Sequence, residues 1–128
     1  MAGKIYLIPI DSVPTETLAW LQGRLGEVLS QTIEQGRQIP APAAAYSSAR
    51  GQYLGEALLS ELQKISLPEA ERLLGLIDHD CSAPGLNFIF GQALPHGPAL
   101  VALPRLRQSF YRRPDEPELF HERLLKEA

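Results

Sequence analysis

Leu73-Leu74-Gly75-Leu76-Ile77-Asp78 is a short apolar run that ends in an acidic residue. Continuous apolar runs of this length are typical of strands that are buried on both faces, as in parallel sheets. The run therefore predicts the central strand of a sheet. A second run of the same kind, Ile5-Tyr6-Leu7-Ile8-Pro9-Ile10, lies at the start of the chain and predicts another strand.

Two segments between these runs carry apolar residues at helical spacing. The first is marked by Leu18, Leu21, Leu25, Val28 and Ile33, and Gly36 is a suitable residue to close it. The second is marked by Leu54, Leu58, Leu62 and Ile65. Between them, residues 38–45 hold two prolines, which confine any strand there to a sheet edge. Residues 46–53 have the polar character of a loop.

Two further strands are expected after the central run, at residues 87–93 and 99–103. Only five residues join them, and parallel strands need a much longer crossover, so this pair is antiparallel. The order is strand, helix, strand, helix, strand, hairpin, helix. It predicts a mixed α/β fold, in which a mostly parallel, twisted sheet carries one antiparallel edge strand and is flanked by helices.

The composition bounds the possible functions. The chain has 128 residues, 45% of them hydrophobic and 21% charged, which fits one globular domain over residues 1–128. A net charge of -3 gives no electrostatic reason to expect nucleic acid or an anionic membrane as a partner. The single cysteine, Cys81, fits a reducing compartment, and no segment approaches the ~18 apolar residues of a membrane span. We therefore expect a soluble cytoplasmic protein.

The loop Asp78-His79-Asp80-Cys81 gathers four residue types that bind metal ions in other proteins. Consecutive residues rarely converge on one ion, and zinc sites usually combine ligands from separate segments. A structural loop whose carboxylates hydrogen-bond nearby backbone amides is therefore the favoured interpretation. Asp80 is the residue that we most expect to be buried and hydrogen-bonded.

Two patterns near the C-terminus are weaker. His121-Glu122 begins an HExxH zinc motif, but position 125, which must then be histidine, is Leu125. Four arginines with aromatic residues among them could form an RNA-stacking patch; they are Arg105, Arg107, Arg112 and Arg113. Because the chain is not basic, a solvated loop is favoured. Composition and spacing alone identify no active site.

The last segment, residues 116–128, begins like a helix and ends without a closing signal. Asp115 and Glu118 have the spacing of a capping box at its start. No Gly, Asn or Pro follows its end, so the segment predicts the beginning of a longer helix that is cut short. Apolar side chains such as Leu124 and Leu125 would then be partly uncovered, and self-association is expected.

A longer segment is more specific. Residues 73–80, followed by Ala83-Pro84-Gly85-Leu86-Asn87-Phe88-Ile89-Phe90-Gly91-Gln92-Ala93, resemble the archaemetzincins, a family of zinc metallopeptidases in the metzincin clan. Three other segments agree with that family in order and spacing: Arg50-Gly51-Gln52-Tyr53, residues 101–107 and residues 122–128. The resemblance covers nearly the whole chain and is strongest from Leu73 onward.

The resemblance implies a metzincin-like upper subdomain and, in the intact family, zinc-dependent peptide hydrolysis. In that family the helix that bears Lys126-Glu127-Ala128 runs into HExxHxxGxxH, which supplies three zinc-binding histidines and a general-base glutamate. This chain ends at Ala128, before those residues. We therefore expect an N-terminal part of an archaemetzincin that has no catalytic or metal-binding residues and that alone binds no zinc and is inactive. Whether the chain acts as an enzyme is left open.

The resemblance carries one site over to this chain, the antiparallel edge strand along the cleft. Phe90, Gly91, Gln92 and Ala93 are its expected substrate-binding residues, where an extended peptide adds to the sheet through main-chain hydrogen bonds. The alternative is a non-catalytic interaction module that binds a peptide along the same strand. A second polypeptide that supplies the zinc site is a third possibility.

Overall fold

The computed structural model describes residues 3–67, 70–86, 88–94 and 97–107. Its main sheet has five strands in the order β2 (Ile33–Gln35), β1 (Lys4–Ile10), β5 (Ala70–Ile77), β8 (Ala99–Ala102) and β7 (Gly91–Ala93). All neighbours are parallel except β7, which lies antiparallel to β8 at the edge. The predicted mixed sheet, with β5 at its centre, is confirmed.

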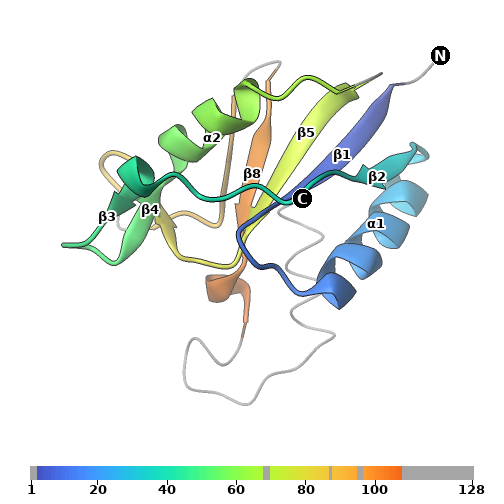
Figure 1. The fold of residues 1–128 in the computed structure, drawn as a ribbon. Coiled ribbons are helices and arrows are strands. Elements are labelled where there is room, and N and C mark those ends of the chain that lie inside the picture. Colours follow the sequence, from blue (N-terminus) through green and yellow to red (C-terminus); the bar gives the residue numbers. More distant parts are fainter. Residues whose placement is uncertain (1–2, 68–69, 87, 95–96, 108–128) are drawn as a thin grey trace.

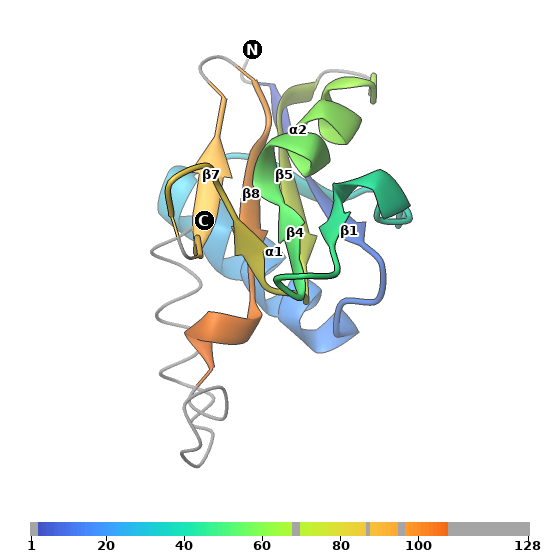
Figure 2. The ribbon, with the colours of Figure 1, turned by 90° about the vertical axis from the view of Figure 1, so that its left-hand side faces the viewer.

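The two main helices cover opposite faces of this sheet (Figure 1). Helix α1 (Thr15–Leu29) buries Leu18, Leu21 and Leu25 against one face. Helix α2 (Gly55–Gln63) buries Leu58, Leu59 and Leu62 against the other face. Figure 2 looks onto the α2 side, with α1 behind the sheet. Strand β5 is apolar at five successive positions because both of its faces are covered.

A second, three-stranded sheet lies on the α2 side, in the order β3 (Tyr46–Ser47), β4 (Gln52–Leu54) and β6 (Cys81–Ser82). The expectation of a plain loop over residues 46–53 was therefore wrong. The polar residues form a tight antiparallel hairpin, with Gly51 in the left-handed region at φ 65°. Glycine adopts that conformation without steric cost, so a polar stretch around Gly51 was a turn signal.

The first helix is shorter than its apolar spacing predicted. It ends at Leu29, since Ser30 adopts a left-handed conformation at φ 52°, and Ile33 begins the edge strand β2. Gly36 closes no helix. It lets the chain pass β1, because a Cβ atom there would lie 2.4 Å from Ile8 Cδ1. Residues 38–45 form a single bridge between Ile39 and Ile10, followed by the 3-10 helix η1 (Ala43–Ala45).

The antiparallel strand pair β7 and β8 is also shorter than expected. Of the described residues 88–93, Gly91–Ala93 form a strand, while Ile89 makes one bridge to Cys81. Strand β8 ends at Ala102 and leads into the 3-10 helix η2 (Pro104–Leu106). The expected cut helix at residues 116–128, its self-association and His121-Glu122 lie outside the described residues. No helix among the described residues is long and apolar enough to cross a membrane.

Candidate functional site

The outer edge of β7 carries main-chain groups that face away from the sheet. Gln92 lies opposite Leu100, the Ala102 amide donates to the Phe90 carbonyl, and the Leu94 amide donates to Pro98. Residues of an antiparallel strand turn their N–H and C=O groups alternately toward and away from the partner. Residues 90, 92 and 94 therefore face β8, whereas Gly91 and Ala93 direct their N–H and C=O groups to the other side, where no strand among the described residues pairs with β7.

Upstream of Gly91 the same edge is closed. The Ile89 amide donates to the Cys81 carbonyl at 2.9 Å, which ties the chain to β6. Phe90 packs against the buried cluster on the α1 face, and its ring lies edge-on to Phe88 at 5.2 Å. The Arg105 guanidinium lies over the Phe88 ring, 4.0 Å from the ring centre. These contacts hold the segment before β7 in one position.

Gln92 connects β7 to the start of α2. Its side chain reaches Gly55, the first residue of α2, where a Cβ atom would lie 2.3 Å from Gln92 Oε1 and 2.8 Å from Ile89 Cδ1. Only glycine permits this close approach. The Oε1 atom of Gln92 is buried and makes no hydrogen bond. No spacing rule applied to the sequence singled out Gly55, because its role depends on a contact with a residue 37 positions away.

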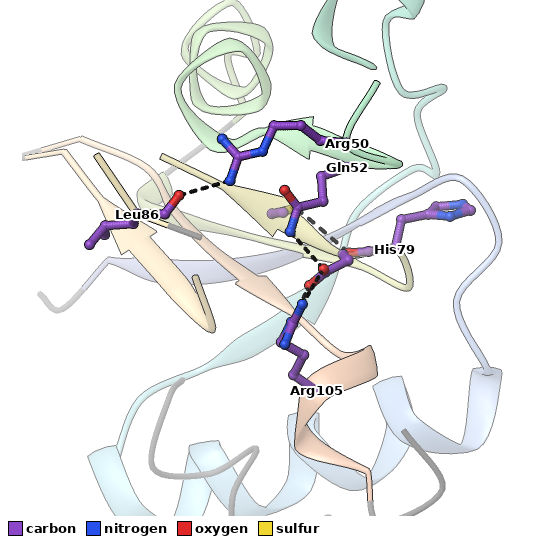
Figure 3. A network of polar contacts seen from close by, with 7 residues as sticks. Arg50, Gln52, His79, Leu86 and Arg105 are labelled. Atoms are coloured by element: carbon purple, nitrogen blue, oxygen red, sulfur yellow. Dashed lines mark hydrogen bonds and ion pairs between the residues drawn. The ribbon is translucent and has the colours of Figure 1, made fainter. Parts of the chain in front are cut away.

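Asp80 anchors the loop that precedes β6. Its carboxylate accepts hydrogen bonds from Arg105 Nε and Nη2, both at 2.9 Å, and from Gln52 Nε2 at 2.8 Å. Figure 3 shows the side chains of Gln52, from β4, and Arg105, from η2, pointing toward each other, and its dashed lines mark hydrogen bonds that they make. Burial alone would raise the pKa of Asp80, but the hydrogen bonds from Arg105 and Gln52 and the guanidinium charge outweigh it, so the pKa lies below its usual 3.8. The expected buried, hydrogen-bonded Asp80 is confirmed.

Two other arginines hydrogen-bond to residues on either side of β6. Arg107 pairs with Asp78, with 3.1 Å between Nη2 and Oδ2. Arg50 Nη2 donates to the Leu86 carbonyl at 3.0 Å (Figure 3). Arg105 and Arg107 are thus engaged by carboxylates of the loop before β6. The other arginines of the possible RNA-stacking patch, Arg112 and Arg113, lie outside the described residues, so the expectation of no nucleic-acid partner stays a prediction.

The four residues of the loop 78–81 do not converge. Asp78 and Asp80 turn to different arginines, and His79 is exposed, with Nε2 3.8 Å from Asp11 Oδ2. Cys81 is fully buried, and burial together with the Asp80 charge raises the pKa of its thiol to about 12. Within residues 3–107, excluding the gaps named above, no three His, Cys, Asp or Glu side chains could hold a metal ion together.

No protein-family model matches the chain. The archaemetzincin of Methanopyrus kandleri is 43% identical over 104 residues, which are 80% of this chain and 55% of that protein. The archaemetzincin of Methanocaldococcus jannaschii is 37% identical over 130 aligned positions, which cover 100% of this chain and 69% of that protein. The chain belongs to the archaemetzincin family.

Solved structures agree with this assignment. The crystal structure of the Methanopyrus kandleri archaemetzincin superposes with a TM-score of 0.82 at 36% identity, over 98% of this chain and 68% of that one. A zinc-dependent peptidase from Methanocorpusculum labreanum, at 21% identity, shares the fold with a TM-score of 0.82 over 95% of this chain and 75% of that one. The family and fold expected from residues 73–93 are confirmed. This archaemetzincin chain spans 55% and 69% of the lengths of its two curated relatives.

Proposed function

We propose that strand β7 binds an extended peptide by strand addition, as the substrate-binding part of an archaemetzincin-type zinc-dependent peptidase. The observation that supports this most is the outer edge of β7, where Gly91 and Ala93 direct their main-chain groups away from the sheet and no described strand pairs with them. An extended peptide uses such an edge as a template for one more strand. The small side chains of both residues leave room for the peptide backbone.

The proposed edge is short, and this limits the affinity. Two outward residues offer at most four main-chain hydrogen bonds, each contributing about 0.5–1.5 kcal/mol net. Ordering the peptide offsets part of this gain. Binding through the backbone alone is therefore expected at about millimolar dissociation constants. Tighter binding needs a pocket for a peptide side chain.

The described residues do not fit a zinc site. Asp78 and Asp80 are occupied by arginines, and the thiol of Cys81 is buried with its pKa raised to about 12. In the sequence, positions four residues after His79, His96 and His121 are not histidine, so HExxH does not occur. We therefore assign substrate binding to this chain and derive no catalytic step. That the chain alone binds no zinc stays a prediction, which metal analysis of the purified protein checks.

A second candidate function is peptide binding without hydrolysis. It is favoured because, within the described residues, the β7 edge strand is formed, whereas the potential metal ligands contact different partners. Mass spectrometry of a peptide incubated with the purified chain and added zinc tests this second function. A single discrete cleavage would contradict it, whereas intact peptide is expected from both functions, because the chain alone is predicted to hold no zinc.

The proposed edge is tested by the substitution Ala93→Pro. Proline removes the outward N–H at position 93, whereas the ladder to β8 keeps the amides of Gln92 and Leu94. We expect at least a tenfold loss of affinity for a labelled eight-residue peptide in a fluorescence anisotropy titration, with a thermal unfolding midpoint close to the parent. Ala93→Ser, which keeps the N–H, is the matched control and should bind like the parent.

The register is checked by the neighbouring position. Gln92→Pro removes an amide that faces β8 and should lower the unfolding free energy by about 3 kcal/mol, in contrast to Ala93→Pro. If Ala93→Pro and the parent bind the peptide equally well, strand addition along β7 is wrong.

A further inference from the structure

A small pocket opens between α2 and β6. It has a volume of about 330 Å³ and is lined by Leu54, Glu56, Ala57, Ser60, Ser82 and Pro84. This is at the low end of the ~300–1,000 Å³ of ligand pockets, so it suits one side chain better than a cofactor. Two of the lining residues, Leu54 and Glu56, flank Gly55 in the sequence, and the Gln92 side chain reaches Gly55 from β7.

Residues of the first turn of α2 line the pocket. Helix α2 begins at Gly55, and no side chain caps its N-terminus, because the preceding residue is Leu54. The amides of Glu56 and Ala57, in the first turn, have no carbonyl partner within the helix. Both residues line the pocket. This end therefore favours a ligand that carries a hydrogen-bond acceptor.

Ser82 provides an independent sign of a binding site. Its side chain is 0% exposed, lines the same pocket, and its Oγ makes no hydrogen bond. A buried hydroxyl without a partner is costly, and native proteins leave few such groups. The other hydroxyl in the pocket, of Ser60, is already used because it donates to the Glu56 carbonyl. A small displacement of the side chains that cover Ser82 would let its hydroxyl donate to a ligand oxygen.

The remaining lining residues narrow the ligand chemistry. Leu54, Ala57 and Pro84 form apolar walls that suit a short aliphatic stem. The Glu56 carboxylate repels an anionic head and accepts a hydrogen bond from an N–H donor. A group that accepts from Ser82 and the α2 amides and donates to Glu56 is a primary carboxamide. Asparagine and glutamine are the side chains that combine such a head with such a stem.

We propose that this pocket binds the carboxamide side chain of an asparagine or glutamine in the peptide that adds to β7. This inference rests on the proposed function, since the peptide edge brings the side chain to the pocket. The link between them is Gln92, which lies in β7 and approaches Gly55 between two lining residues, Leu54 and Glu56. The pocket adds the side-chain recognition that a two-residue edge lacks.

The test is a positional series of labelled eight-residue alanine–serine peptides, titrated into the full chain. Glutamine is placed at each position in turn, and the best position is then changed to glutamate, leucine or lysine. We expect glutamine at one position to bind at least fivefold more tightly than each of these three. Ser82→Ala should abolish this preference without lowering the unfolding temperature, because no hydrogen bond is lost.

Two further variants sharpen the result. Glu56→Gln removes the repulsive carboxylate and should raise the affinity of the glutamate peptide at least threefold. Ser48→Ala, at an exposed position of the β3–β4 turn, is the matched control and should leave every affinity unchanged. Binding of all peptides with equal affinity would overturn the pocket and leave the β7 edge standing. No binding by any peptide would overturn both.

Discussion

Replacing Asp80 by alanine is expected to lower the free energy of unfolding by about 2–4 kcal/mol. The substitution leaves the Arg105 guanidinium and the Gln52 amide without their shared acceptor. The side chains of Asp80 and Arg105 are only 16% and 22% exposed, so water compensates them in part. Urea denaturation followed by circular dichroism measures the effect, as a lower midpoint at unchanged slope.

The control for this prediction is another carboxylate of the same chain. Glu61 pairs with Lys64 at 2.9 Å, but the Lys64 side chain is 70% exposed. Glu61→Ala should therefore cost less than about 1 kcal/mol. Equal losses for the two variants would show that the Asp80 network does not hold the loop before β6.

The Asp80 carboxylate makes the free energy of unfolding depend on pH. Because the pKa of Asp80 in the folded chain is lower than its usual 3.8, its contribution is present above about pH 4. It is lost as the pH falls through the folded pKa. The difference in unfolding free energy between the parent and Asp80→Ala should accordingly shrink below pH 4.

The second large effect is expected at Gly75, in the centre of β5. A Cβ atom there would lie 2.7 Å from Leu62 Cδ1 and 3.3 Å from Ile10 Cδ1, and Leu62 is fully buried. Gly75→Val should therefore overpack the interface between α2 and β5 and cost about 3 kcal/mol. Gly23→Val, at an exposed helical position with nothing within 4 Å, should be nearly neutral.

Overpacking predicts a specific non-additivity. Leu62→Ala alone should cost about 2–5 kcal/mol by leaving a cavity. In the double variant the valine fills part of that cavity, so the total loss should be smaller than the sum of the single losses. Additive losses in chemical denaturation would mean that Gly75 and Leu62 do not share the space.

The sheet could be predicted from the sequence because its central strands are continuous apolar runs. Strands buried on both faces are continuously apolar, so residues 5–10 and 73–78 could be recognised as strands. The connection of five residues is too short for a parallel crossover, so it predicted an antiparallel edge strand. The end of α1 could not be predicted in this way. Ile33 continues the helical spacing but is buried as part of β2, beside β1, so tertiary packing decided its conformation.

The edge strand could be located from the sequence, but the direction of its individual main-chain groups could not. Residues 90–93 were expected to bind a peptide, but the register with β8 decides that Gly91 and Ala93 face outward while Gln92 faces inward. A pattern of alternating residues does not reveal this phase. The pocket at Ser82 and Glu56 was missed entirely, because α2 and β6 come from distant parts of the chain.

The most direct test of the proposed peptide edge is an NMR titration of the ¹⁵N-labelled chain with an eight-residue peptide. We predict that the amide resonances of Gly91 and Ala93 shift on binding and that their amide protons become protected from exchange. The Gln92 amide, which already faces β8, should be protected with and without the peptide. Saturable binding that leaves the Gly91 and Ala93 amides unchanged, or no saturable binding, would contradict strand addition along β7.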